Sequence, residues 1–276
     1  MADVAASTAF RVCTAIADLR VRARAFRAQG RSIGLVFVRK ALHEGHRALI
    51  ERSVAECDET IVALLPRWEA QAADVPEDRA AEVETLRAAG VSVVFTPERE
   101  TFWPDGDDTR VVILSLPDTE ADAKISLMLT SALKLLCWAQ PTHLYFGEKY
   151  PLRLAALRRM VWDLALDVTL VSCGVVRNAQ GLPASGGGEE DLAIAAAVRA
   201  VDETVTSLLH TGARSAALLV DAVEQAVRAQ NDVTLARVHV VGQSTMQPVE
   251  SADTGDMVLY TLRRGDREVD ESIVIG

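Results

Sequence analysis

The sequence predicts an α/β protein with a doubly wound parallel sheet, followed by a smaller α+β unit. Before residue 100, short apolar segments alternate with segments of helical period in the order β-α-β-α-β. This alternation is typical of a parallel sheet with helices on its faces. A glycine-rich segment, 174–188, then separates these elements from two further helices and three strands.

The elements of the first part follow one another along the chain with few interruptions. Glycines at 30 and 90 end the first and third helices. Segments 66–76 and 96–108 are polar or rich in turn residues, which favours loops. Helices are expected at 14–28, 47–57, 77–89, 122–139 and 152–166, and strands at 32–38, 60–65, 91–95, 111–114, 142–146 and 168–173.

The part after the glycines has a simpler pattern. Helices are expected at 192–209 and 215–228, and strands at 235–241, 257–262 and 268–275. Few contacts are expected to cross a glycine-rich segment. We therefore predict a nucleotide-binding domain at 1–174 and a smaller lid domain at 175–276.

Composition narrows the class of protein. The chain has 276 residues, of which 49% are hydrophobic, and a net charge of −10. A non-specific nucleic-acid binder needs a basic surface, so this class is disfavoured. The four cysteines form no Cys-x-x-Cys motif, which favours buried free thiols in a reducing compartment. No apolar segment is long enough to span a bilayer, and no signal peptide is evident. We expect a cytoplasmic protein.

A pair of histidines stands where the first long strand meets a helix. The stretch is Ala-Leu-His-Glu-Gly-His at 41–46, between an expected strand at 32–38 and an expected helix at 47–57. The carboxyl ends of parallel strands are where ligands bind, and a helix N-terminus attracts phosphate. Gly45 allows a ligand to approach the backbone, and His43 and His46 can stabilise charge on a departing pyrophosphate.

Two other interpretations of this stretch are open. The histidines can be solvated side chains at an ordinary helix start. They can also bind a metal, although Glu44 is not spaced as in the His-Glu-x-x-His zinc motif. The strand before and the helix after them favour a role with nucleotide phosphates.

A second strand-to-helix junction carries Gly147, Glu148 and Lys149. A lysine there can reach a phosphate as a mobile point charge. A single lysine is more often a solvated surface residue. Both strand-to-helix junctions are suited to anions. Together they favour a nucleotide site more strongly than either junction does alone.

Taken in order, these motifs resemble the pantothenate synthetase (pantoate–β-alanine ligase) family along almost the whole chain. The resemblance rests on six segments. They are Ala41-Leu42-His43-Glu44-Gly45-His46, Phe102-Trp103-Pro104-Asp105-Gly106, Gln140-Pro141, Tyr145-Phe146-Gly147-Glu148-Lys149, Leu154 to Leu164, and Val176-Arg177 with Gly181-Leu182.

The resemblance implies a Rossmann-like nucleotidyltransferase domain with a C-terminal lid, and a homodimer. It implies that ATP, assisted by Mg²⁺, and a carboxylic acid give an acyl-adenylate and pyrophosphate, after which an amine gives an amide and AMP. His43, His46 and Lys149 would then be catalytic. Gly45, Gly147, Val176 and Ser185 would contact the nucleotide, and Glu82 aligns near the magnesium-associated carboxylate.

Several positions depart from the family pattern. The family's Asn-Pro aligns with Arg67 and Trp68 without a gap, or its proline aligns with Pro66, and neither alignment restores the Asn. A pantoate-binding Gln aligns with Arg153. Pro-Thr-Met-Gly before the histidines is replaced by residues 37–40, and the lid-loop Ser-Ser-Arg-Asn by residues 185–188. A segment that the family has before the long helix is missing.

These departures gather on the side of the acid substrate, where four basic residues align: Arg39, Lys40, Arg67 and Arg153. Arginine binds carboxylates and phosphates through paired hydrogen bonds. We therefore expect an acid other than pantoate, with an additional anionic group. We expect about half of these side chains to face solvent or an acidic neighbour instead.

Two hypotheses from different classes follow. The first is an ATP-dependent carboxylate–amine ligase with a changed acid. The second is a catalytically reduced homologue that binds a nucleotide or an anionic metabolite, or serves as a partner subunit. Loss of the lid-loop arginine supports the second hypothesis, and retention of both histidines supports the first. An enzyme that forms amides without ATP is a third possibility, for which the sequence gives no positive sign.

Overall fold

A computed structural model describes residues 10–39, 41–65, 79–106, 108–114, 121–178, 192–242, 245, 247–265 and 267–276. The chain forms two compact units. The first consists of the chain up to Val112 with Ala123–Gly147 and Arg158–Cys173, and the second consists mainly of Glu148–Leu157 and Gly174–Gly276.

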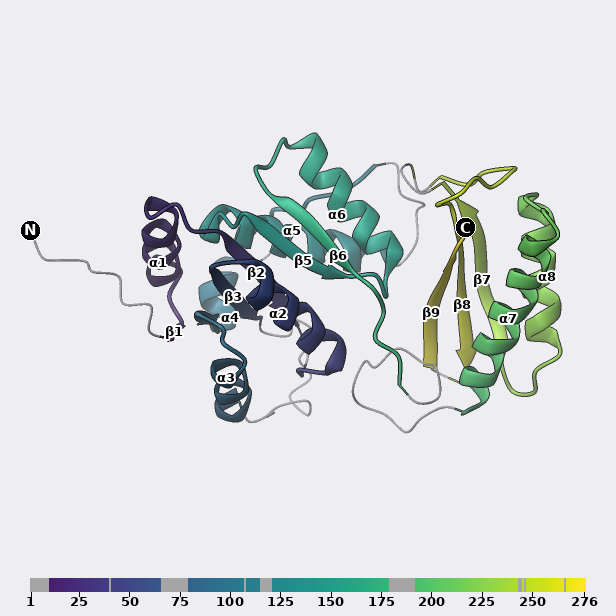
Figure 1. Ribbon diagram of the computed structural model, residues 1–276, viewed down its shortest axis with the longest axis horizontal. Helices are drawn as coiled ribbons and strands as arrows, with labels where there is room; N and C mark the ends of the chain where they lie inside the picture. The colour runs from purple at the N-terminus through teal and green to yellow at the C-terminus, as the bar shows by residue number, and fades with distance from the viewer. Residues whose placement is uncertain are drawn as a thin grey trace, which may run out of the picture. The chain divides into compact units, whose positions relative to one another are not determined.

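The first unit is built on a six-stranded sheet in the order β1-β4-β3-β2-β5-β6 (Figure 1). Every neighbouring pair is parallel, which confirms the predicted fold class. The strands are β1 (Arg11–Cys13), β2 (Ile33–Val38), β3 (Glu59–Leu64), β4 (Val93–Phe95), β5 (His143–Gly147) and β6 (Thr169–Cys173).

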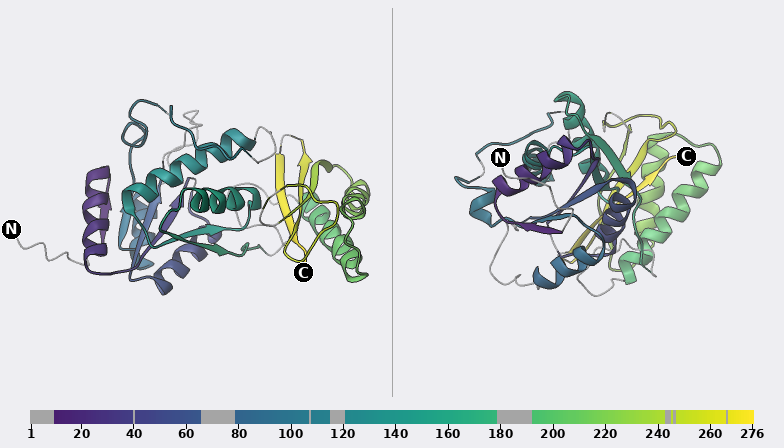
Figure 2. Two further views of the ribbon diagram at one scale, coloured as in Figure 1. Left: turned by 90° about the horizontal axis from the view of Figure 1, so that it is seen from above. Right: turned by 60° about the vertical axis from the view of Figure 1, so that its left-hand side comes forward.

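Helices cover both faces of this sheet, which accounts for its nearly continuous apolar strands. Leu49 and Ile50 of one helix and Leu86 of another pack with Val36, Val62 and Val94 on one face. On the other face, Phe95 meets Trp138 with ring centroids 6.2 Å apart. Figure 2 shows helices on both sides of the sheet. The helices are α1 (Ile16–Ala28), α2 (Glu44–Glu56), α3 (Arg79–Ala88), α4 (Arg99–Phe102), α5 (Ala121–Ala139) and α6 (Pro151–Asp163).

The second unit packs two helices on one face of an antiparallel sheet, in the strand order β7-β8-β9 (Figure 1). Side chains alternate along the central strand. Val258, Tyr260 and Leu262 face the helices, whereas Met257 and Leu259 pack with Leu152 and Ala155. The elements are α7 (Leu192–His210), α8 (Ala216–Arg228), β7 (Thr234–Val241), β8 (Met257–Arg264) and β9 (Arg267–Val274).

Three short elements differ from the sequence prediction. Residues 111–114 form no strand, although Val111, Val112 and Ile113 are apolar. Conversely, β1 and α4 were not expected, because three or four residues carry too little periodicity to be detected. The expected loop at 66–76 lies outside the described residues.

The expectation that all four cysteines are buried is wrong. The cysteines are free, and Cys13 and Cys173 are buried, but Cys57 is half-buried and Cys137 is exposed. Cys137 lies on the outward side of α5, whereas the preceding residues Leu135 and Leu136 are buried in the core. None of the helices in the described part of the chain has the length and apolar character of a membrane span.

An arginine anchors the segment after β6 to the sheet of the second unit. The Arg177 guanidinium contacts the carboxylate of Glu271 on β9, with Nη2 3.3 Å from Oε2. Burial raises the pKa of Glu271, and the charge of Arg177 opposes that rise. Burial likewise raises the pKa of Asp202, which accepts a hydrogen bond from the Tyr260 hydroxyl at 3.3 Å. The positive charge of Arg177 therefore opposes the burial-induced rise in pKa of two carboxyl groups, those of Glu271 and Asp202.

We expect Arg177→Met to lower the free energy of unfolding at pH 7. Removing one partner of a buried ion pair costs about 3–5 kcal/mol. Because 36% of the Arg177 side chain is exposed, we expect about 1–3 kcal/mol. Without Arg177 the pKa of Glu271 rises further, so the folded state binds a proton more tightly than the unfolded chain. The deficit should shrink as the pH falls from 7 toward 4.5, the ordinary value for glutamate.

Chemical unfolding of the full chain, followed by circular dichroism, tests this expectation. Arg228→Met is the matched control, since 76% of the Arg228 side chain is exposed and it pairs only with Glu224 one turn away. Adding Glu271→Gln should recover part of the deficit. A deficit that is equal at both pH values, and unchanged by Glu271→Gln, would contradict the anchoring role.

Candidate active site

The two predicted histidines lie together at the N-terminus of α2. His43 is the residue before the helix, and its carbonyl accepts the N–H of Arg47 at 3.0 Å. His46 lies in the first helical turn, and the two imidazole rings stack with centroids 3.7 Å apart at an angle of 26°. Both side chains are half-buried. The rings thus form one unit at a helix end whose first N–H groups have no partner within the helix.

The position of this helix end in the sheet is where α/β proteins bind ligands. Strand β2 has β3 on one side and β5 on the other. The chain thus changes direction across the sheet between β2 and β5, which makes this a topological switch point. Phe37 of β2 and Phe146 of β5 lie with ring centroids 5.9 Å apart near the carboxyl ends of both strands. The histidine pair therefore lies at the strand ends where α/β proteins bind ligands.

Gly147 ends β5 at this same edge of the sheet. A Cβ atom placed on Gly147 would meet no described heavy atom within 4 Å. Space for a ligand beside the backbone is therefore available here. The sequence predicted that each motif follows a strand, and the structure shows in addition that these strands, β2 and β5, are neighbours.

Lys149 and Arg153 belong to the second unit and share an aromatic partner. The Lys149 Nζ is 5.0 Å from the centroid of the Tyr150 ring, and the Arg153 Cζ is 4.1 Å from it. Cations above an aromatic face are held by the ring quadrupole. The charge of Lys149 also opposes the pKa rise of buried Glu271. The ring of Tyr150 therefore orders both cations.

Arg39 and Glu82 belong to the first unit, next to the histidine stretch. Arg39 follows the last residue of β2 and is half-buried. Glu82 on α3 accepts the backbone N–H of Leu42 at 3.0 Å through Oε1, and its Oε2 lies 2.9 Å from Arg79 Nη1. Among the described residues, no group of three or more His, Cys, Asp or Glu side chains is placed to hold a metal ion.

The remaining predicted residues divide between described and undescribed segments. Val176 is half-buried, two residues after exposed Gly174. Gly45 lies in the first turn of α2. Lys40, Arg67 and Ser185 lie outside the described residues.

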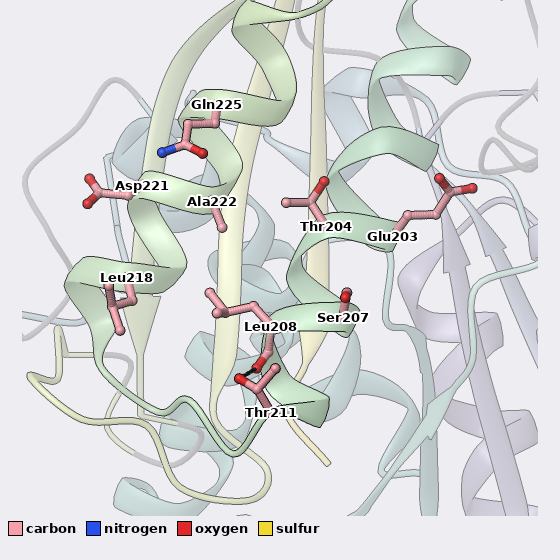
Figure 3. A pocket seen from close by; sticks show the side chains of 9 residues that line it. All are labelled: Glu203, Thr204, Ser207, Leu208, Thr211, Leu218, Asp221, Ala222 and Gln225. Carbon is pink, nitrogen blue, oxygen red and sulfur yellow. Dashed lines mark hydrogen bonds between the residues drawn. The ribbon is translucent and has the colours of Figure 1, made fainter.

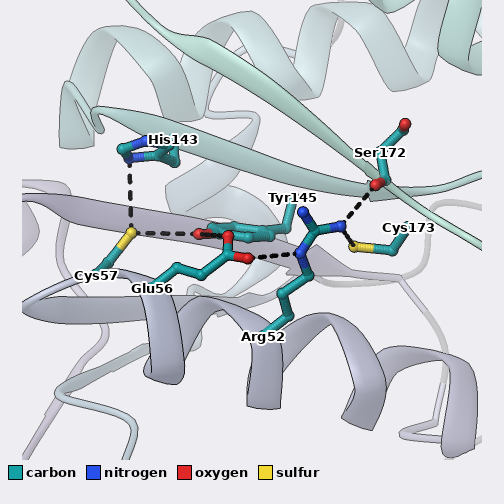
Figure 4. A network of polar contacts seen from close by, with 7 residues as sticks. All are labelled: Arg52, Glu56, Cys57, His143, Tyr145, Ser172 and Cys173. Carbon is teal, nitrogen blue, oxygen red and sulfur yellow. Dashed lines mark hydrogen bonds and ion pairs between the residues drawn. The ribbon is translucent and has the colours of Figure 1, made fainter.

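A polar network that sequence analysis missed fastens α2 to the strands beside it (Figure 4). Arg52 donates to Glu56 at 2.8 Å and to the Ser172 carbonyl at 2.9 Å, and the Tyr145 hydroxyl donates to Glu56 at 3.0 Å. The hydrogen bond from Arg52, and then that from Tyr145, lowers the pKa of Glu56. Tyr145 lies on β5 and Ser172 on β6, so the network keeps α2 in register with both strands.

The first two residues of the Phe-Trp-Pro-Asp-Gly motif pack into the core, whereas Pro104, Asp105 and Gly106 are exposed. Phe102 is fully buried, and 7% of Trp103 is exposed. Lys134 of α5 donates to the Phe102 carbonyl, and its Nζ is 3.8 Å from the Trp103 ring centroid. Burial lowers the pKa of Lys134. The motif therefore joins α4 to α5 through a lysine among aromatic rings.

A groove on the second unit contains none of the predicted site residues (Figure 3). It has a volume of about 640 Å³ and lies between α7 and α8. Its charged lining residues are the acids Glu203 and Asp221. Because carboxylates repel phosphate, the charges of this groove disfavour a nucleotide.

Comparisons with known proteins identify one family. A family model described as pantoate-beta-alanine ligase matches residues 11–268. The pantothenate synthetase of Bartonella tribocorum is 29% identical over 96% of this chain and 98% of its own. That of Nocardia farcinica is 34% identical over 77% of this chain and 69% of its own.

Solved structures agree on the fold. Pantothenate synthetase from Thermus thermophilus superposes with a TM-score of 0.82 at 24% identity, over 96% of this chain and 99% of that one. Pantoate-beta-alanine ligase from Francisella tularensis, described as complexed with beta-gamma ATP and beta-alanine, gives a TM-score of 0.64 at 19% identity, over 96% of this chain and 98% of its own. The expectation of an ATP-dependent, amide-forming ligase is confirmed at the level of the family. With a family match that spans almost the whole sequence, this chain belongs to the pantoate–β-alanine ligase family.

Proposed function

We propose that this protein activates a carboxylic acid with ATP and transfers the acyl group to an amine, and that its acid is not pantoate. The observation that carries the first part is the stacked His43–His46 pair at the N-terminus of α2, beside the topological switch point. Unsatisfied N–H groups, the positive end of the helix dipole and two imidazoles favour a polyphosphate there.

Two steps account for the reaction. In the first, a carboxylate oxygen bonds to the α-phosphorus of ATP while the bond from that phosphorus to the pyrophosphate oxygen breaks. In the second, the amine nitrogen bonds to the acyl carbon, the bond from that carbon to AMP breaks, and the amine releases a proton. His43 and His46 would stabilise charge on the departing pyrophosphate, with Lys149 as a mobile cation on the phosphates.

The proposal of a different acid rests on cations that align near the pantoate side of the family's site, and of these Arg153 replaces a neutral amide. Arg153 is ordered on the Tyr150 ring and Arg39 directly follows β2. Arg67 and Lys40 add to this charge in the sequence. Guanidinium groups pair with a second carboxylate or a phosphate in a way that a neutral amide does not. The names of the relatives make pantoate the competing acid.

Arg39 also offers a replacement for the lid-loop arginine, whose place is taken by one of the glycines at 186–188. We propose that Arg39 or Lys40 supplies the cation at the transferred phosphate. A catalytically reduced homologue would not need the stacked histidine pair. Because both histidines are present and stacked, we favour an active ligase.

The accompanying proposals concern nucleotide, metal and assembly. We propose that Gly45, Gly147, Val176 and Ser185 contact the nucleotide. Mg²⁺ would arrive on the ATP phosphates, since this ion keeps few protein ligands when it binds a nucleotide. We also propose a cytoplasmic homodimer, to which the exposed Trp162 and the edge strand β6 would be available.

The substrate proposal predicts acid-dependent release of AMP. Purified protein with Mg·ATP and a primary amine such as β-alanine should form AMP and pyrophosphate with a dicarboxylic or phosphorylated acid, at a kcat/KM at least tenfold above that with pantoate. Chromatography of the nucleotides measures the release. A higher kcat/KM with pantoate would contradict the changed acid, and no AMP with any acid would contradict the ligase.

Replacing His46 tests its role toward the phosphates separately from any role in folding. His46→Ala should lower kcat for AMP release by about 10²–10³-fold, the effect of removing one positioned donor, while the thermal midpoint changes little. His239→Ala, at an exposed position on β7, is the matched control and should leave kcat unchanged. Normal turnover in His46→Ala would overturn the role of the histidine pair.

A further inference from the structure

The carboxylate of Glu82 joins α3 to the histidine stretch. Its Oε1 accepts the N–H of Leu42 at 3.0 Å, although the two residues are 40 positions apart in the sequence. The Leu42 side chain and Val83, the residue after Glu82, pack against the same buried cluster. The contact between α3 and Leu42 is therefore both polar and apolar.

Leu42 immediately precedes His43, the N-cap residue of α2. The position of the Leu42 backbone therefore affects the position of His43. His43 itself has extended backbone angles, φ −137° and ψ 171°, and no side-chain hydrogen bond caps the helix. A peptide N–H fixed at Leu42 restrains the direction in which the chain enters α2. The imidazole of His43, and through stacking that of His46, depends on this direction.

Both oxygens of Glu82 already have protein partners. Oε2 pairs with Arg79 at 2.9 Å, and only 11% of the Glu82 side chain is exposed. A magnesium ion at this carboxylate would compete with the N–H of Leu42 or with the Arg79 guanidinium. The residues around Glu82 fit a hydrogen-bond acceptor better than they fit a ligand of Mg²⁺.

We propose that Glu82 is a positioning residue, which holds the Leu42–His43 segment so that the histidine pair faces the phosphates, and that it is not a magnesium ligand. This proposal rests on the proposed function of His43 and His46. The Arg79 side chain is 41% exposed, and an exposed ion pair contributes little to stability. We therefore assign to Arg79 the role of orienting the Glu82 carboxylate.

Two substitutions distinguish the role of Glu82 as a hydrogen-bond acceptor from the role of its negative charge. Glu82→Gln keeps an oxygen that can accept the Leu42 N–H but loses the negative charge, whereas Glu82→Ala loses both. We expect Glu82→Ala to lower kcat for AMP release up to about 100-fold through displacement of His43. Glu82→Gln should keep kcat within fivefold of the unaltered protein. The Mg²⁺ concentration at half-maximal rate should change less than twofold in both variants.

Hydrogen exchange gives a measurement that needs no turnover. In the free protein, Glu82→Ala should raise the exchange rate in peptides that span residues 41–46 at least tenfold, and Glu82→Gln should raise it less than threefold. Glu84→Gln is the matched control, because Glu84 lies on the same helix and pairs with Arg87 at 3.6 Å with 64% of its side chain exposed. It should change neither exchange nor kcat.

Either measurement can overturn the proposal. Unchanged exchange at 41–46 in Glu82→Ala means that Glu82 does not hold this segment. A tenfold or larger increase in the required Mg²⁺ with Glu82→Gln identifies a metal ligand. If the unaltered protein releases no AMP with any acid, the proposed function fails, and the exchange measurement still decides whether Glu82 positions His43.

Discussion

Parallel pairing of β2 with β5 is the constraint on which the rest of the first unit depends. Through it the strand that leads to His43 and the strand that ends at Gly147 reach the same edge of the sheet. Helix α2 must then return across one face, and its N-terminus is left at the carboxyl end of β2. Topology alone therefore places a helix N-terminus at this edge of the sheet, and this placement supports the proposed phosphate site.

Side chains then restrain this helix at both of its ends. Arg52 and Glu56, in its later turns, bond to β6 and β5, while Glu82 bonds to the segment that leads into its first turn. A helix restrained in this way can present two half-buried histidines in a fixed arrangement. Preorganised donors are what stabilisation of a developing negative charge requires.

The sequence predicted the sheet well because its central strands are buried on both faces. All six residues of β3 are buried, and its last four, Ile61 to Leu64, form a continuous apolar run of the kind that is easily found. The expected strand at 111–114 has a similar composition, but no neighbouring strand pairs with it among the described residues. Strand formation there depends on a partner, which local composition does not reveal.

For the candidate site, the sequence located the histidine pair and Gly147 but not what holds them. The two junctions are visible as local motifs, since each spans fewer than ten residues. The hydrogen bond from Leu42 to Glu82, and that from Tyr145 to Glu56, join segments that are distant along the chain. Contacts of this kind follow from tertiary packing, so no local pattern could reveal them.

The central claim is that the helix end at His43 binds the phosphates of ATP. Calorimetric titration of the unaltered protein with ATP and Mg²⁺, with no acid or amine present, tests it most directly. The account predicts saturable one-site binding with a Kd below 1 mM, which weakens as salt is raised. No detectable heat at millimolar ATP, at two temperatures, would contradict the phosphate roles of His43, His46 and Lys149.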